Sequence, residues 1–221
     1  MNSLIVMIST GAIAYLIGAI PFGFLIGRLR GVDIRTVGSR NIGATNVFRT
    51  LGKGWGSATF VLDLGKGLCG TLWFPLLATH WLGSADAAPP APELRLLGGV
   101  AAVVGHTWPV YLGFRGGKGV ATSAGMLLGL APAAVAVALA AWIVTFAASR
   151  FVSLGSVVAA GVMGVAIWLP GLRPQGSIVL PAVLSLLAML VIVRHRANLQ
   201  RLWTGTEPRA AFRPRRPERE A

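Results

Sequence analysis

The stretch GHTWPVYLGFRGGKGVAT, residues 105–122, lies between two long apolar segments and contains a histidine, two cations and five glycines. A glycine-rich turn exposes backbone N–H groups, and Lys118 adds a positive charge, a combination that binds phosphate. Glycine suits such a turn because a backbone that approaches an anion closely leaves no room for a Cβ atom. A Walker loop would need Ser or Thr where the chain has Gly119, and no strand pattern precedes the turn. The stretch is therefore either a phosphate-binding loop of another kind or a plain connecting turn.

The composition around this stretch is that of a membrane protein. The chain has 221 residues, of which 54% are hydrophobic and 12% charged, and its mean hydropathy is +0.69. Soluble domains are about a quarter charged. The apolar runs are long enough to cross a hydrocarbon core of about 30 Å, and they are continuous, which excludes the alternating pattern of a transmembrane barrel. We predict an all-α, polytopic integral membrane protein.

The number of spans depends on how one long apolar run is divided. Residues 120–148 are interrupted by Ala131-Pro132, and helices end readily before a proline. Dividing the run there gives about seven transmembrane helices, some of them short. The apolar segments expected to supply these helices are residues 3–27, 54–80, 95–112, 120–148, 152–169 and 178–194.

Charge distribution orients the spans. Residues 28–53 contain six cations and residues 81–93 contain none, so the former suit a cytoplasmic loop and the latter an outer one. With seven spans the N-terminus lies outside, and the arginine-rich C-terminus is cytoplasmic. Most of the net charge of +13 then reflects topology rather than nucleic-acid binding. We expect residues 1–207 to form one helical membrane domain and residues 208–221 a basic, disordered cytoplasmic tail.

Few residues within the apolar runs carry chemistry of their own. Asp63 and Lys66 are three residues apart, so on a helix they share a face and can pair inside the bundle. The single cysteine, Cys69, cannot form an intramolecular disulfide. The three histidines are far apart and no ligand-spaced cluster occurs, so we expect neither a metal site nor a cofactor.

Two further polar segments resemble the first in character. Residues 38–49 read GSRNIGATNVFR, and residues 194–207 read RHRANLQRLWTGTE. Both supply neutral donors and acceptors together with arginines, whose planar guanidinium groups suit phosphate. Taken singly, the former could be a solvated loop with a helix cap, and the latter a charged stop after the last span. In the seven-span arrangement, all three polar segments face the same compartment.

Read together, the three segments resemble the motifs of the bacterial acyl-phosphate:glycerol-3-phosphate acyltransferases of the PlsY type. The resemblance covers the chain from the first span to Glu207, and Asp63-x-x-Lys66-Gly67 also fits. One departure is Arg40, where glycine would be expected more often. The motif residues are Ser39-x-Asn41-x-Gly43-Ala44-Thr45-Asn46-x-x-Arg49; Gly105-His106-x-x-Pro109 with Phe114-x-Gly116-Gly117-Lys118-Gly119-x-Ala121-Thr122; and His195-Arg196-x-Asn198-x-x-Arg201-Leu202-x-x-Gly205-x-Glu207.

The resemblance implies a multi-pass enzyme of the bacterial inner membrane with its active site facing the cytoplasm. Such an enzyme transfers a fatty acyl group from acyl phosphate to the 1-hydroxyl of sn-glycerol 3-phosphate. Its products are lysophosphatidic acid and phosphate, in the first step of phospholipid synthesis. It would need neither a cofactor nor nucleic acid, and it would use acyl carrier protein or CoA only indirectly. The alternative from another class is a membrane transporter of a phosphorylated metabolite, since polar segments and broken helices suit transport too.

With this resemblance, roles can be assigned to the motif residues. The expected catalytic groups are Ser39, Arg49, Lys118, His195 and Asn198. Substrate and phosphate would be bound by Asn41, Gly43, Thr45, Asn46, His106, Gly116, Gly117, Gly119, Thr122 and Arg201. Structural roles fall to Asp63, Lys66 and Glu207.

Two of these roles have alternatives. His195 would act either as the general base or as a hydrogen-bond donor to phosphate. If His195 is not the base, a phosphate oxygen of the substrate takes the hydroxyl proton. His106 could contact substrate, but a structural role where Pro109 breaks the helix is the preferred interpretation.

Overall fold

The computed structural model describes residues 3–82, 91–172 and 178–210, and all regular structure within these ranges is helical. This confirms the predicted all-α class. The elements are α1 (Ser3–Gly18), α2 (Phe22–Leu29), α3 (Ala44–Leu51), α4 (Lys53–Leu82), α5 (Pro92–Thr107), the 3-10 turn η1 (Val110–Leu112), α6 (Val120–Leu130), α7 (Pro132–Ser149), α8 (Val152–Ala166), α9 (Val179–Arg194) and α10 (Arg196–Trp203).

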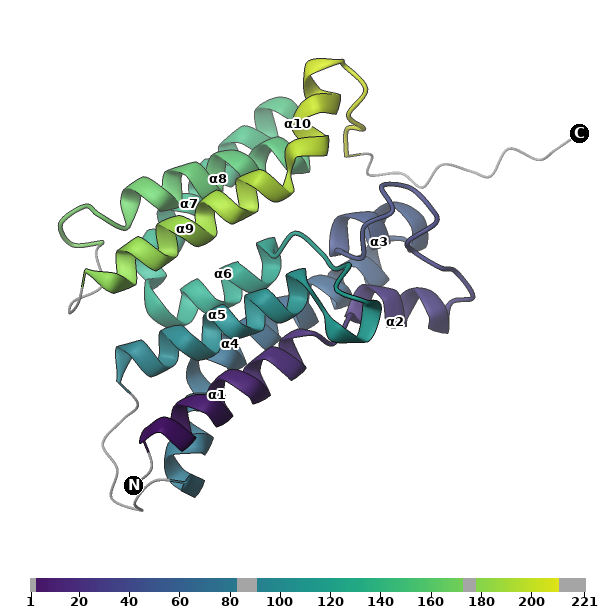
Figure 1. Cartoon of the computed structure of the whole chain (residues 1–221). Coiled ribbons are helices and arrows are strands. Elements are labelled where there is room, and N and C mark those ends of the chain that lie inside the picture. Colours follow the sequence, from purple (N-terminus) through teal and green to yellow (C-terminus); the bar gives the residue numbers. More distant parts are fainter. Residues whose placement is uncertain (1–2, 83–90, 173–177, 211–221) are drawn as a thin grey trace, which may run out of the picture.

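The helices form two packed groups (Figure 1). In one group α4 packs against α1, α5 and α6; in the other, α8 packs against α7 and α9. Buried apolar side chains join the groups, among them Val103 of α5, Met126 of α6, Met163 of α8 and Leu184 of α9. A smaller core formed by Ile26, Ile34, Ile42 and Val47 holds α2, α3 and the loop between them together.

Small residues allow a close crossing between α4 and α6. A Cβ atom at Gly67 would overlap the carbonyl oxygen of Thr122, and one at Gly125 would overlap that of Leu64. Close backbone approach through small residues is the usual basis of helix association within membranes, where burial of apolar surface supplies no driving force between helices. The packing of α4 on α6 therefore depends on these glycines.

The predicted interruption of the long apolar run is confirmed. Helix α6 ends at Leu130 and α7 begins at Pro132, whose missing N–H is not needed in a first helical turn. The carbonyl of the intervening Ala131 accepts the N–H of Val135 at 3.1 Å and so begins α7. A similar break separates α1 from α2 around Pro21.

The predicted count of about seven spans is not shown by the helix lengths. Among the described residues, three helical segments are long and apolar enough to cross a membrane, namely Ser3–Leu29 (α1 and α2 taken together), Lys53–Leu82 and Pro132–Ser149. A fourth is added if α9 and α10, which are bent by 50°, count as one broken span. The apolar helices α6 and α8 have 11 and 15 residues, short of the roughly 20 that a straight crossing needs. Residues 83–90 of the predicted outer loop, and residues 211–221 of the predicted tail, lie outside the described residues.

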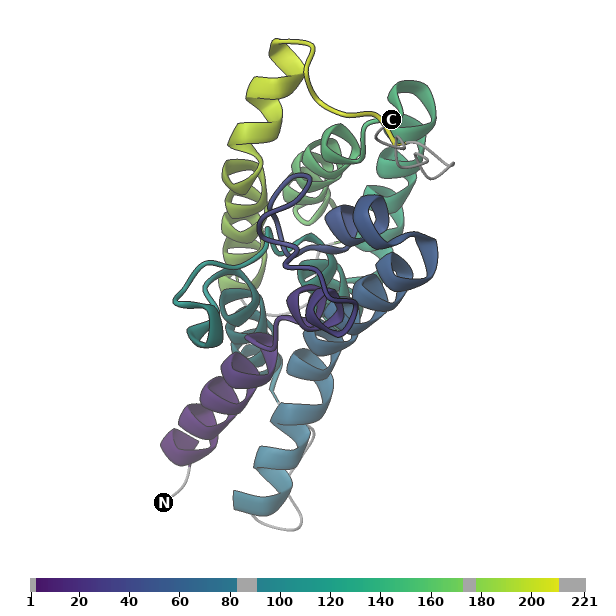
Figure 2. The ribbon, with the colours of Figure 1, turned by 90° about the vertical axis from the view of Figure 1, so that its right-hand side faces the viewer.

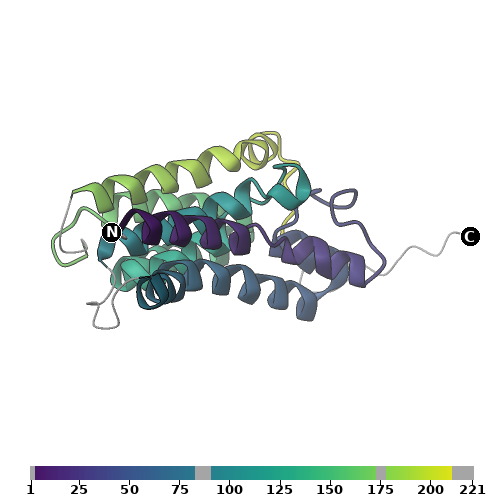
Figure 3. The same cartoon turned by 60° about the horizontal axis from the view of Figure 1, so that its bottom comes forward.

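The three polar segments gather at one end of the helical bundle (Figure 3). This end lies away from the amino terminus, where α1 begins. Beyond α10, the chain runs back across this end toward the connection between α7 and α8 (Figure 2), and the N–H of Ala210 donates to the carbonyl of Arg150 at 2.8 Å. The fold thus brings residues that are far apart in sequence to one place.

Candidate active site

The loop before α3 is shaped by the buried side chain of Asn46, which is only 1% exposed. Its Oδ1 accepts the N–H of Ser39 at 2.9 Å, and its Nδ2 donates to the carbonyls of Ile34, Val37 and Asn41 at 2.9–3.1 Å. The amide has two N–H groups for these three carbonyls, so one N–H is shared, and the single buried side chain pairs backbone groups that would otherwise be costly to bury. Asn46 lies behind the loop, and Ser39 and Asn41 lie at its surface.

The backbone conformation of this loop explains why glycine is expected where this chain has Arg40. Arg40 has φ +56°, in the left-handed region that glycine occupies without a Cβ penalty. That preference accounts for the glycine expected here. The following turn is closed by Asn41, whose Oδ1 accepts the N–H of Gly43 at 2.9 Å, a typical Asx turn.

The loop between η1 and α6, residues 113–119, which we call the glycine-lysine loop, is fixed from two sides. The N–H of Gly116 donates to the carbonyl of Thr107 at 3.2 Å, and that of Gly117 to the carbonyl of His106 at 3.0 Å. On the other side, the guanidinium of Arg194 donates to the carbonyls of the same two glycines at 3.2 and 2.9 Å. The N–H groups of Gly116 and Gly117 are therefore hydrogen-bonded to the end of α5. The group of this loop that lines the cavity described below is the Lys118 side chain.

The polar segment at residues 194–207 holds Lys118 through a chain of hydrogen bonds that ends on Glu207. Lys118 Nζ donates to Asn198 Oδ1, and Asn198 Nδ2 donates to Glu207 Oε1 at 2.7 Å. The same carboxylate accepts Ser153 Oγ at 2.7 Å and Arg201 Nε at 2.8 Å. Burial alone would raise the pKa of Glu207, but the bonds from Ser153, Asn198 and Arg201 outweigh it and hold that pKa below its usual value.

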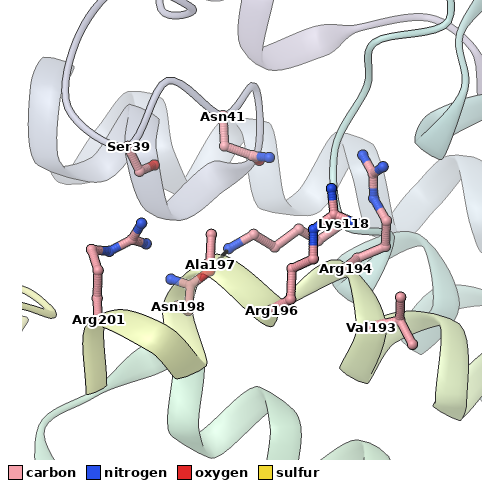
Figure 4. A pocket seen from close by; sticks show the side chains of 9 residues that line it. All are labelled: Ser39, Asn41, Lys118, Val193, Arg194, Arg196, Ala197, Asn198 and Arg201. Carbon is pink, nitrogen blue, oxygen red and sulfur yellow. Dashed lines mark hydrogen bonds between the residues drawn. The ribbon is translucent and has the colours of Figure 1, made fainter. Parts of the chain in front are cut away.

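These segments line an open cavity of about 250 Å³ (Figure 4). Four of its lining residues are cations and none is a carboxylate, so the cavity favours an anion. Ser39 and Asn41 face the cations from the opposite wall and add neutral hydrogen-bonding groups. The lining residues are Ser39, Asn41, Lys118, Val193, Arg194, Arg196, Ala197, Asn198 and Arg201.

Two titratable groups of the site have strongly lowered pKa values. Burial lowers the pKa of Lys118 to about 8. Burial, followed by the charge of Lys118, lowers the pKa of His195 to about 4. His195 Nδ1 lies 2.8 Å from the carbonyl oxygen of Val191, so the neutral ring carries its proton on Nδ1, and Nε2 is unprotonated. Histidine at this position is therefore neutral at pH 7.

Several residues expected at the site do not line the cavity. Arg49 donates to the carbonyl of Pro208 at 3.0 Å and so ties α3 to the segment after α10. Thr122 is fully buried where α6 meets α4, and His195 is 3% exposed beneath the wall. The others are Gly43, Thr45, Asn46, His106, Gly116, Gly117 and Gly119.

The residues for which structural roles are predicted form ion pairs. Lys66 Nζ and Asp63 Oδ1 lie 2.8 Å apart within α4, which confirms the predicted pairing. Glu207 pairs with Arg201. In residues 3–82, 91–172 and 178–210, no three His, Cys, Asp or Glu side chains gather as metal ligands would.

Sequence reasoning assigned no role to three contributors to the site. Arg194 and Arg196 line the cavity, and Ser153 of α8 bonds Glu207. The two arginines flank His195 in sequence, so their proximity to that motif was an available signal. Ser153 stands in an apolar helix with no motif beside it, and only the packing of α8 against α10 brings it to the carboxylate.

We expect Gly117→Ala to raise the KM for a phosphate-bearing substrate more than it lowers the amount of folded protein. A Cβ atom at this position would overlap Nε2 of the His106 ring, so either that ring or the loop that carries Lys118 must move. Steady-state kinetics on purified protein would measure the effect. An unchanged KM would show that the loop does not bind phosphate.

Over the residues that the structure describes, this is a helical membrane protein with apolar helices of membrane-crossing length and a cation-lined cavity at one end of the bundle. The glycerol-3-phosphate acyltransferase family model matches residues 8–205. The chain belongs to this family.

Individual relatives agree with the family match. A glycerol-3-phosphate acyltransferase of Desulforudis audaxviator is 45% identical over 96% of this chain and 100% of its own length. One of Geobacter sulfurreducens is 46% identical over 90% of this chain and 94% of its own.

Solved structures of PlsY (YgiH), an integral membrane glycerol 3-phosphate acyltransferase, share the fold. Its glycerol 3-phosphate form superposes with a TM-score of 0.77 at 37% identity, covering 93% of this chain and 96% of that one. Its lysophosphatidic acid form has a TM-score of 0.73 at 36% identity, covering 96% and 97%.

Proposed function

We propose that this protein transfers a fatty acyl group from acyl phosphate to the 1-hydroxyl of sn-glycerol 3-phosphate. The observation that carries the proposal is the cavity in which Lys118, held by Asn198, faces Ser39 and Asn41 among three arginines. Both substrates carry phosphate, and the site offers the charges and donors that phosphate needs. Family membership and the two PlsY forms support acylation of glycerol 3-phosphate rather than transport.

The reaction is an acyl transfer between oxygens. The 1-hydroxyl oxygen attacks the carbonyl carbon of the mixed anhydride, and a tetrahedral oxyanion forms. The bond from that carbon to the phosphate oxygen then breaks, phosphate leaves with the electron pair, and 1-acyl glycerol 3-phosphate remains. Lys118 and the cavity arginines stabilise the charge on the oxyanion and on the departing phosphate, which is often the largest catalytic contribution.

Ser39 and Asn41 orient glycerol 3-phosphate from the opposite wall. Arg49 and Asn46 support that wall, Arg49 through Pro208 and Asn46 through the loop backbone. Asn198 holds the Lys118 ammonium in place, and Arg201 shares its charge between Glu207 and the cavity.

The hydroxyl proton passes to a phosphate oxygen of the substrate in this proposal. His195 is a poor candidate for the base because it does not line the cavity and its pKa is lowered to about 4 by burial and by Lys118. A group with so low a pKa removes protons weakly near neutral pH. A pH–rate profile that shifts when His195 is replaced would instead identify histidine as the base.

We expect kcat/KM to fall as the pH rises through about 8. The pKa of Lys118 is lowered to about 8 by burial, so above this pH the free enzyme loses the ammonium that attracts phosphate. Lys118→Arg should remove this alkaline limb, because arginine stays protonated, although its absolute activity falls. A pH profile of initial rates would measure both, and an identical limb in the arginine variant would assign the ionisation to another group.

The membrane arrangement belongs to the same proposal. The enzyme lies in the bacterial inner membrane with its amino terminus outside and its cation-rich end, including the tail at 208–221, in the cytoplasm. The short helices α5, α6 and α8 cross together with the long ones, nested against them or in locally thinned bilayer, to give seven spans in one domain. Acyl carrier protein and CoA are not required directly.

Purified protein in lipid nanodiscs would test the function. Phosphate release should require both palmitoyl phosphate and glycerol 3-phosphate, with lysophosphatidic acid formed in equal amount. Counterflow of glycerol 3-phosphate across proteoliposomes without any chemistry would instead support the transporter. Labelling that places Ser39 and Lys118 on opposite sides of the membrane would contradict both the topology and the shared pocket.

A further inference from the structure

Three titratable side chains are buried together outside the cavity. Asp63 and Lys66 of α4 are 3% and 2% exposed, and their Oδ1 and Nζ atoms lie 2.8 Å apart. His106 Nδ1, at the end of α5, lies 3.4 Å from the same Asp63 oxygen. Charges are expensive to bury in a membrane helix, and an apolar pair of similar volume is often at least as stable. Helix packing alone therefore does not account for them.

One end of this cluster reaches the glycine-lysine loop. The carbonyl of His106 accepts the N–H of Gly117 at 3.0 Å, and Gly117 packs so closely on the imidazole that a Cβ atom would overlap it. Gly117 directly precedes Lys118. The position of the His106 ring, which Asp63 contacts, therefore sets where the Lys118 side chain begins.

The other end reaches the loop that carries Ser39 and Asn41. Lys66 Nζ donates at 2.9 Å to the carbonyl of Ile20, at the break between α1 and α2. Helix α2 begins two residues later, and its Gly23 lies against the carbonyl of Ile42, where a Cβ atom would overlap. Ile42 directly follows Asn41. The bond from Lys66 to Ile20 therefore sets the position of α2, and through α2 the position of the cavity wall formed by Ser39 and Asn41.

We propose that Asp63 and Lys66 are positioning residues that hold the two walls of the substrate cavity at a fixed spacing. Asp63 acts through His106 on the Lys118 wall, and Lys66 acts through Ile20 and α2 on the Ser39–Asn41 wall. The ion pair between them joins the two supports on a single turn of α4. The inference rests on the proposed function, because the quantity it controls is the fit of glycerol 3-phosphate between these walls.

The test replaces the pair by apolar residues of similar size, in Asp63→Leu/Lys66→Met. This variant removes both outward contacts without leaving a lone buried charge. We expect it to remain folded, with a KM for glycerol 3-phosphate raised about tenfold or more and a much smaller change in kcat, because the walls are displaced while the reacting groups remain. The KM for palmitoyl phosphate should change less than that for glycerol 3-phosphate.

Thr71→Val is the matched control. Thr71 is also fully buried on α4, and its hydroxyl contacts the carbonyls of Gly67 and Met126, so it serves the α4–α6 crossing and neither wall. Its KM values should equal those of the wild type. A folded apolar-pair variant with the same KM values as the control would overturn the proposal, and so would a loss of rate that only follows the fraction of folded protein.

A second variant covers the case in which the apolar pair does not fold. Asp63→Glu keeps the charge and lengthens the side chain by one methylene, so it should raise the KM for glycerol 3-phosphate while the melting temperature stays near that of the wild type. A wild-type KM in this variant would also contradict the proposal. The wild-type protein separates the two hypotheses: if it releases no phosphate with both substrates, the proposed function fails, whereas normal wild-type turnover with unaltered variants contradicts the positioning role alone.

Discussion

Lys118→Ala should abolish turnover, with kcat/KM reduced by about 10²–10³-fold or more, while the protein stays folded in the membrane. The ammonium is the one cation that the glycine-lysine loop brings to the cavity, and it faces the wall formed by Ser39 and Asn41. Alanine removes both the charge that we propose binds phosphate and the partner of Asn198. Phosphate release from palmitoyl phosphate and glycerol 3-phosphate would measure the loss.

Arg115→Ala is the matched control for this prediction. Arg115 lies in the same loop and is also a cation, but it is exposed and does not line the cavity. Its removal changes the net charge equally and should leave kcat/KM within about threefold, since an exposed charge beyond the cavity is largely screened by salt. Retention of more than half the activity in Lys118→Ala would remove Lys118 from the site.

Glu207→Ala should lower both stability and activity. The carboxylate is buried and accepts hydrogen bonds from Ser153, Asn198 and Arg201. Without it, two buried donors lose their acceptor and Arg201 loses its counter-charge, at a cost of about 2–4 kcal/mol in the free energy of unfolding. The Asn198 amide is then free to turn away from Lys118, so kcat/KM should also fall in the protein that remains folded.

Thermal unfolding in detergent and kinetics normalised to folded protein would separate these two effects. Glu93→Ala serves for comparison, because Glu93 is an exposed carboxylate in the first turn of α5, outside the cavity. It should change the melting temperature little and the rate not at all. If Glu207→Ala melted like the wild type and kept its rate, the chain from Glu207 through Asn198 to Lys118 would have no functional role.

Periodicity and composition predicted much of the fold because they are local properties. The break at Ala131-Pro132 follows from the missing N–H and the steric demands of proline, and the structure has it. The pairing of Asp63 with Lys66 follows from helical spacing. The number of membrane spans could not be predicted from local properties in the same way. Helices α6 and α8 are too short to count as spans by length alone, and they pack against neighbouring helices.

The site was predictable to the extent that its chemistry lies in contiguous motifs. Ser39, Asn41, Lys118, Asn198 and Arg201 all line the cavity. A motif does not show which of its members face a ligand, however. Asn46 has the side chain of a binding residue, yet it turns inward to satisfy the loop backbone, and the N–H groups of Gly116 and Gly117 bond to α5.

The sequence by itself determined that this protein is helical and built for a membrane, and it predicted phosphate-binding chemistry in the three polar segments, because side-chain type and local spacing encode these properties. Only the tertiary structure decided that Ser153 reaches Glu207, that Arg194 clamps the glycine-lysine loop and that Lys66 contacts the Ile20 carbonyl. Each of these contacts joins residues more than 40 positions apart. Their distances are set by how helices pack on one another, through glycines and buried apolar side chains, and no local pattern contains that information.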